Sequence, residues 1–153
     1  MSNTQSMCNS FKNELLTGQH NFGAGVVRAA TTADTFMAAL YLTTATMNSA
    51  TTVYTTTGEI AAGTVNYTAG GIAVTNATPP TLYGSTATWT PSANLVWPTL
   101  TAPTAFDTVL IYNSTQGNKA VSVHTFGAQT VTAGTFTLTM PTPGAGTSLL
   151  NLA

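Results

Sequence analysis

Charged side chains are almost absent from this chain of 153 residues. Only 5% of its residues are Asp, Glu, Lys or Arg, whereas soluble domains usually hold about 25%. Charge therefore does not keep the protein dissolved or apart from its neighbours. A neutral exterior is tolerable where other subunits cover much of it, so the composition favours a structural role in an assembly over catalysis.

Basic residues are scarce and do not cluster. Lys12, Arg28 and Lys119 lie far apart in the sequence, and the formal net charge is -1. Direct binding of nucleic acid needs several cations that neutralise neighbouring phosphates. We therefore expect no direct nucleic-acid partner.

Cysteine pairs and long apolar runs are also missing. Cys8 is the only cysteine, so it forms no internal disulfide, and without a CxxC or Cys/His cluster the sequence predicts no metal and no cofactor. No window approaches the roughly 20 apolar residues that cross a bilayer, and the first residues do not follow the signal-peptide pattern. We expect a protein that is made in the cytoplasm and stays outside membranes.

Candidate catalytic groups are few and scattered. His20 and His124 could be combined with Asp34, Glu59 or Asp107 in a catalytic or metal set. Their spacing matches no such motif, no GxSxG element is present, and the carboxyls show no local pairing of the kind that glycosidases use. The more ordinary interpretation is an exposed loop histidine and a strand histidine, so we expect no enzyme.

Threonine is what the chain holds in abundance, with 34 residues. A β-branched side chain suits a pleated surface while its hydroxyl remains solvated. From Asp34 onward apolar residues alternate with others, and Phe36, Ala38, Leu40 and Leu42 form one strongly apolar strand face. Threonine and this period of two together predict β-structure.

The second half of the chain shows further strands and one turn. Residues 106–112 predict a strand, 114–118 a hairpin turn and 120–126 the returning strand. A last strand opens at Gly134, with Phe136, Leu138 and Met140 on one side and threonines on the other. Earlier, Gly70-Gly71 predicts a bulge or a tight turn.

Prolines divide the chain between residues 79 and 103. Pro91, Pro98 and Pro103 follow the pair Pro79-Pro80, and proline cannot donate to a strand ladder. This density excludes long central strands, so we expect short edge strands and extended loops there.

One helix is predicted, over about residues 9–17, where Phe11 and Leu15 fall on one face and Gly18 ends the segment. With several short alternating strands, this favours one domain over residues 1–153. Its predicted class is mainly β, an antiparallel β-sandwich, immunoglobulin-like or jelly-roll-like, with one short N-terminal helix.

The tryptophans allow more than one interpretation. Trp89 and Trp97, with Tyr83 and Tyr112, could form a platform on which sugar rings stack. Aromatic rings also anchor cores and subunit contacts. Core, interface and sugar binding therefore remain alternatives for these side chains, with core or interface favoured.

A series of segments along nearly the whole chain resembles a family of small virion proteins of tailed phages. The segments are Cys8-Asn9-Ser10-Phe11-Lys12, Glu14-Leu15-Leu16, His20-Asn21-Phe22, Asp34-Thr35-Phe36, Ala39-Leu40-Tyr41, Thr51 to Thr56, Gly58-Glu59-Ile60, Tyr67 to Gly71, Leu110 to Asn113, Asn118 to Val121 and Gly134 to Leu138. They occur in order, and the resemblance is distinctive as a set.

The resemblance implies a component of the virus particle, and specifically a capsid cement or decoration protein on the capsid exterior, assembled in the host cytoplasm. Its expected partner is the major capsid protein, and a homotrimer is the expected assembly. We expect the helix face with Phe11 and Leu15, and the proline-rich stretch with Trp89 and Trp97, to make the contacts.

Two other functions remain open. A tail, adaptor or fibre component would share the composition but be present in far fewer copies per virion. A carbohydrate-binding module would use the tryptophan platform.

Overall fold

The computed structural model describes residues 3–8, 11, 19–20, 22, 33–60, 64–75, 80–83 and 86–152. Eight strands lie in this part of the chain: β1 (Ser6–Met7), β2 (Phe36–Leu42), β3 (Ile72–Ala73), β4 (Thr81–Tyr83), β5 (Thr86–Trp89), β6 (Leu95–Asn113), β7 (Lys119–Leu138) and β8 (Leu150–Leu152). Of the predicted helix over about 9–17, only Phe11 belongs to the described residues.

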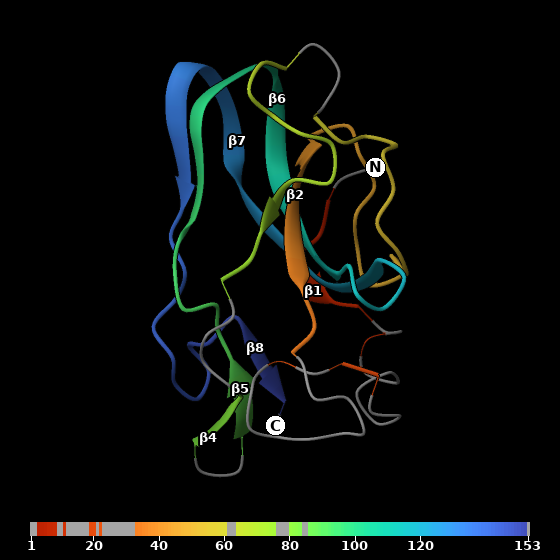
Figure 1. Cartoon of the computed structure of the whole chain (residues 1–153), viewed down its shortest axis with the longest axis vertical. Helices are drawn as coiled ribbons and strands as arrows, with labels where there is room; N and C mark the ends of the chain where they lie inside the picture. Colours follow the sequence, from red (N-terminus) through yellow and green to blue (C-terminus); the bar gives the residue numbers. More distant parts are fainter. Residues whose placement is uncertain are drawn as a thin grey trace.

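The strands form two sheets, and every strand pairing is antiparallel. The larger sheet has the order β1-β7-β6-β2-β3 and the smaller one the order β4-β5-β8. Figure 1 shows the small sheet at the lower end of the molecule, near the C-terminus. The predicted class, mainly β with antiparallel sheets, is confirmed.

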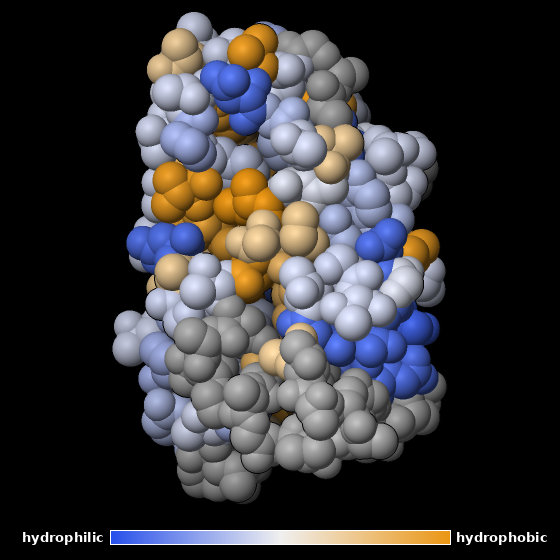
Figure 2. Space-filling model, viewed as in Figure 1, coloured by the Kyte–Doolittle hydropathy of each residue, from blue (hydrophilic) through white to orange (hydrophobic). Residues whose placement is uncertain are grey.

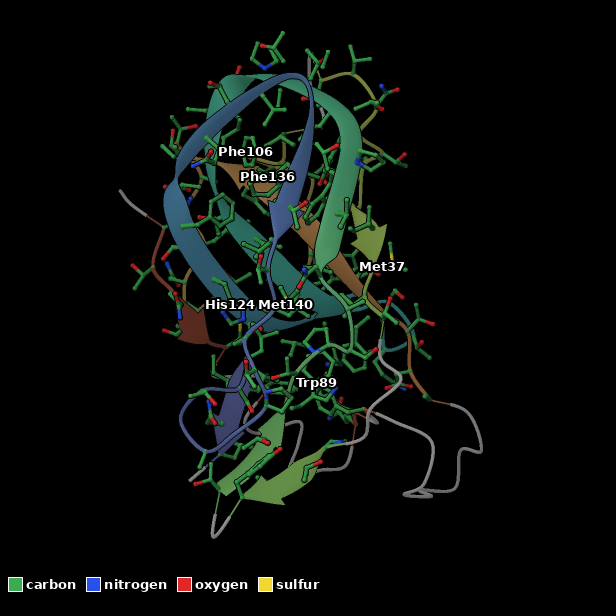
Figure 3. All side chains as sticks on the ribbon, turned by 90° about the vertical axis from the view of Figure 1, so that its left-hand side faces the viewer. Met37, Trp89, Phe106, His124, Phe136 and Met140 are labelled. Carbon is green, nitrogen blue, oxygen red and sulfur yellow. The ribbon has the colours of Figure 1, made fainter. Side chains whose placement is uncertain are left out.

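The hairpin of β6 and β7 folds over itself and so makes two layers. Gln129 pairs with Phe106, and Phe136 pairs with Trp97. A straight strand from Gln129 to Phe136 would span about 23 Å, yet the rings of Phe106 and Phe136 lie 5.0 Å apart. The ribbon therefore bends sharply (Figures 1 and 3), and its aromatic side chains fill the space between the layers.

The prediction of short edge strands around the prolines was wrong for residues 95–103. β6 is 19 residues long and contains Pro98 and Pro103. On the side away from β7, its first half pairs with no described strand, and Thr101 forms a bridge with Val65 between the two prolines. The register also shifts around both prolines. A largely unpaired edge and these irregularities accommodate residues that lack an N–H group.

β7 likewise joins two predicted strands into one. The segments 120–126 and 134–140 were expected to be separate, but β7 runs from Lys119 to Leu138. The turn at 114–118 is confirmed. The alternation after Gly134 is also confirmed, since Thr135, Thr137 and Thr139 are exposed whereas the apolar residues between them are half-buried.

β2 is buried on both faces, not on one. Phe36 and Leu40 are fully buried as predicted, and Ala39 and Tyr41 on the opposite side are fully buried too. The connection that follows β2 covers this second face, because it contains Ile60 and Glu59, which are 2% and 4% exposed. The main core therefore extends on both sides of β2.

Candidate interaction surface

Three of the four residues expected to make contacts are core residues of the chain. Phe11, Trp89 and Trp97 are 0%, 3% and 2% exposed, and Leu15 lies outside the described residues. Trp89 packs against Phe36 at 5.5 Å between ring centroids. These side chains hold the fold together, so a contact surface has to be sought elsewhere.

A buried carboxylate holds the connection after β2 in place. Glu59 accepts hydrogen bonds from the Tyr54 hydroxyl at 2.7 Å, the Tyr67 hydroxyl at 2.8 Å and the Gly70 N–H at 2.7 Å. Burial, together with the charge of Glu59, raises the pKa of Tyr67 far above its usual value. The hydroxyl therefore keeps its proton and remains a donor.

The same cluster reaches the backbone of β2. The Tyr67 hydroxyl accepts the N–H of Leu40 at 2.9 Å, and the Tyr41 hydroxyl donates to the carbonyl of Thr55 at 2.6 Å. Tyr112 donates to the carbonyl of Gly70 at 2.8 Å. We call Glu59 with these four tyrosines the tyrosine cluster. A carboxylate that already has three donors acts as a structural tie here.

A second buried polar group lies at the end of the β6–β7 hairpin. The Asn113 side-chain amide donates to Asp34 Oδ2 at 2.8 Å and lies 3.0 Å from His20 Nδ1. Its own oxygen accepts the N–H of Gln116 at 3.1 Å. His20, which the sequence placed in an exposed loop, is only 7% exposed. The amide stands between the histidine and the carboxylate and ties them to the hairpin turn.

His124 does not join His20. Its Nε2 lies 2.9 Å from the hydroxyl of Ser122, and burial lowers its pKa to about 4. It is therefore neutral at pH 7. Within the described residues no group of His, Cys, Asp and Glu has the arrangement of a metal site, and no helix there has the length and apolarity to span a bilayer.

The described surface carries no exposed charged side chain. Four of the seven charged residues belong to the described part: Asp34 and Glu59 are buried, and Asp107 and Lys119 are half-buried. Asp107 also accepts hydrogen bonds from Asn3 and Thr108, both at 2.7 Å. Over the described surface, the low charge of the sequence is thus lower still.

Apolar side chains gather on one face of this neutral exterior. Figure 2 shows them in the middle of the view, over β3 and the neighbouring part of the ribbon. Val96 in the first half of β6 is 42% exposed, and Met37 of β2 and Ile72 of β3 are half-buried. Proteins expose contiguous apolar area where something binds.

Comparisons with known proteins find no matching family model, no similar curated protein and no similar solved structure. The resemblance to phage virion proteins therefore stays a prediction from the sequence.

Proposed function

We propose that this chain is a structural protein of a tailed-phage virion, and specifically a capsid cement or decoration protein. The observation that carries the proposal is the absence of exposed charge from the whole described surface. Such a surface is poorly suited to a freely dispersed protein and well suited to one whose neighbours cover it.

The proposed mechanism is mechanical. The protein binds the major capsid protein on the capsid exterior, at junctions between capsomers. Three copies of this chain assemble there as a homotrimer. Each site gains about 25 cal/mol per Å² of apolar surface that it buries, less the cost of ordering the partners. Many equivalent sites then add up to a more stable shell. The proposal includes no cofactor and no catalytic step.

A tail, adaptor or fibre component is the alternative that the surface supports equally. The two differ in copy number, because a cement protein follows the shell lattice and a tail component does not. Sugar binding through a tryptophan platform has lost its support, since Trp89 and Trp97 are 3% and 2% exposed.

The first experiment counts copies in purified particles. Quantitative gel densitometry against the shell protein should give a simple fraction of the shell copy number. A count of six, twelve or another small multiple of three would reject the cement role and favour the tail. Absence of the protein from particles would reject both.

The second experiment tests the shell directly. Particles that lack the protein should lose their genome at a lower temperature than complete particles, and the purified chain should restore the difference when it is added back. A thermal release profile that is the same with and without the chain would contradict stabilisation of the shell.

A further inference from the structure

Among the described residues, β7 has an open edge over most of its length. β1 pairs with it only at Ser122 and Val123, and the N–H of Cys8 reaches the carbonyl of Val121 at 3.3 Å. From Thr125 to Leu138, no described strand other than β6 pairs with β7. In Figure 3, where this side faces the viewer, the second half of β7 lies at the front of the ribbon.

This edge lacks most of the features that normally prevent strand pairing. Proteins protect open edges with charged side chains, prolines, very short strands or bulges. β7 contains no proline and is 20 residues long, and residues 120–152 include no Asp, Glu, Lys or Arg. Its register against β6 shifts at several points, and one shift lies between the pairs Phe136↔Trp97 and Gly134↔Leu100. The extra residue of that shift is on β6, and Ala133, with a φ of 46°, precedes it on β7, so β7 continues from Gly134 to Leu138 as a segment with no inserted residue. That segment, Gly134 to Leu138, is called the β7 docking edge below.

A groove of about 420 Å³ lies beside the β7 docking edge. Gln5, His124, Leu138 and Met140 are among the residues that line it. Figure 3 shows His124 and Met140 next to each other, below the arrowhead of β7. No lining side chain carries a charge at pH 7, because burial lowers the pKa of His124 to about 4. The groove therefore fits neutral polar and apolar side chains of an extended chain.

We propose that a strand of a second copy of this chain pairs with the β7 docking edge and places side chains in the adjoining groove. Strand addition supplies main-chain hydrogen bonds that need no particular sequence. Complementary charge usually selects a different protein as the partner, and this edge has no charged side chain. Two copies of a neutral chain, in contrast, meet without repulsion, and threonines that face each other across strands pair favourably.

This edge would be the surface through which copies of the chain assemble. The proposal rests on the proposed function, in which several copies of the chain lie side by side on the virion. Its test uses the purified chain alone. A negative result would therefore remove this surface while leaving capsid binding open, whereas the particle experiments above test capsid binding without depending on this edge.

The test compares two double variants of equal charge. Thr135→Lys with Thr137→Lys adds two cations to exposed positions of the β7 docking edge, and Thr56→Lys with Thr57→Lys adds two at exposed positions of the connection after β2. Sedimentation equilibrium should show oligomers for the wild type and the loop variant. The edge variant should dissociate at least about tenfold more readily, with an unchanged circular dichroism spectrum.

Amide hydrogen exchange gives a second measurement that needs no variant. In the wild type, residues 134–138 should exchange more slowly at high than at low protein concentration, whereas residues 54–58 should be unaffected. A wild type that stays monomeric at millimolar concentration would overturn the proposal. Oligomers that both double variants weaken equally, or that leave exchange at 134–138 unchanged, would overturn it as well.

Discussion

On the edge of β2 that faces away from β6, the backbone N–H and carbonyl groups form hydrogen bonds with the connection that follows β2. Phe36 bonds with Val74, Leu40 with both Tyr67 and Ile60, and the N–H of Leu42 with the carbonyl of Gly58. Beyond β7, β1 covers only the first few residues, and the described chain leaves the rest open. The described part of the chain thus closes one side of the sheet with its own residues and leaves the other side available to a neighbour.

The closed side owes its order to polar groups that are buried and bonded. The tyrosine cluster satisfies the carboxylate of Glu59 with three donors, and such groups fix one arrangement because any other leaves a charge without partners. The open side is built from threonines and half-buried apolar residues, which contain no buried charge that needs hydrogen-bond partners. Substitutions should therefore be costly beyond β2 and cheap beyond β7.

The largest effect is expected at Gly71, where the connection returns to β2. Its φ is 77°, and a Cβ there would lie 1.8 Å from the carbonyl oxygen of Ala38. Gly71→Ala should lower the free energy of unfolding by about 4 kcal/mol or more, measured by urea denaturation. Gly117 is the matched control, because its φ is 67° and nothing lies near its Cβ. Gly117→Ala should cost only about 1 kcal/mol, and equal losses would refute the steric argument.

Removal of the carboxylate of Glu59 comes next. Glu59→Ala leaves two tyrosine hydroxyls and the N–H of Gly70 without their acceptor, and should lower the free energy of unfolding by about 3 kcal/mol. Glu59→Gln keeps one oxygen acceptor in the same place and should cost roughly half as much. If the two variants are equally stable in thermal unfolding, the cluster does not hold this side of the sheet.

Local patterns were enough to predict the β class but not the two polar clusters. The alternation of Phe136 and Leu138 with threonines is visible within a few residues, because a strand has a period of two. The donors of Glu59, in contrast, lie five, eight and eleven positions away, and that spacing matches no motif. They converge only because the connection folds back over β2.

The contact residues could not be chosen from the sequence for a related reason. Trp89 and Trp97 stand among prolines, which suggested short edge strands and extended loops, but the bent β6–β7 ribbon buries Trp97, whose ring lies 5.7 Å from that of Phe136. The bend depends on contacts between residues far apart in the chain, so no window of sequence reveals it. The predicted neutral exterior needed no such contact, because composition alone limits how much charge a surface can carry.

An effect of similar size, which appears only on acidification, is expected on the open side. Burial lowers the pKa of His124 to about 4 from its ordinary value of 6.5. Above pH 6.5 the histidine is neutral in both the folded and the unfolded chain, and its contribution to the free energy of unfolding is fully present. Between pH 6.5 and 4 the unfolded chain takes up a proton that the folded chain does not. The free energy of unfolding therefore falls by about 3 kcal/mol over this range.

The variant His124→Gln isolates this contribution. The difference in unfolding free energy between wild type and variant should change by about 3 kcal/mol from pH 7 to pH 4, while the carboxyls titrate equally in both proteins and cancel. A difference that does not vary with pH would show that His124 is solvated in the folded chain.

The smallest effect on stability is expected at the β7 docking edge itself. Thr137 is exposed and opposite Val96 on β6, so Thr137→Lys removes no buried contact and should change the unfolding free energy of the dissociated chain by no more than about 0.5 kcal/mol. Measurements at low protein concentration separate this value from the effect on assembly. A loss of several kcal/mol in the monomer would mean that the edge is part of the chain's own packing, and the contrast between the closed and open sides of the sheet would then disappear.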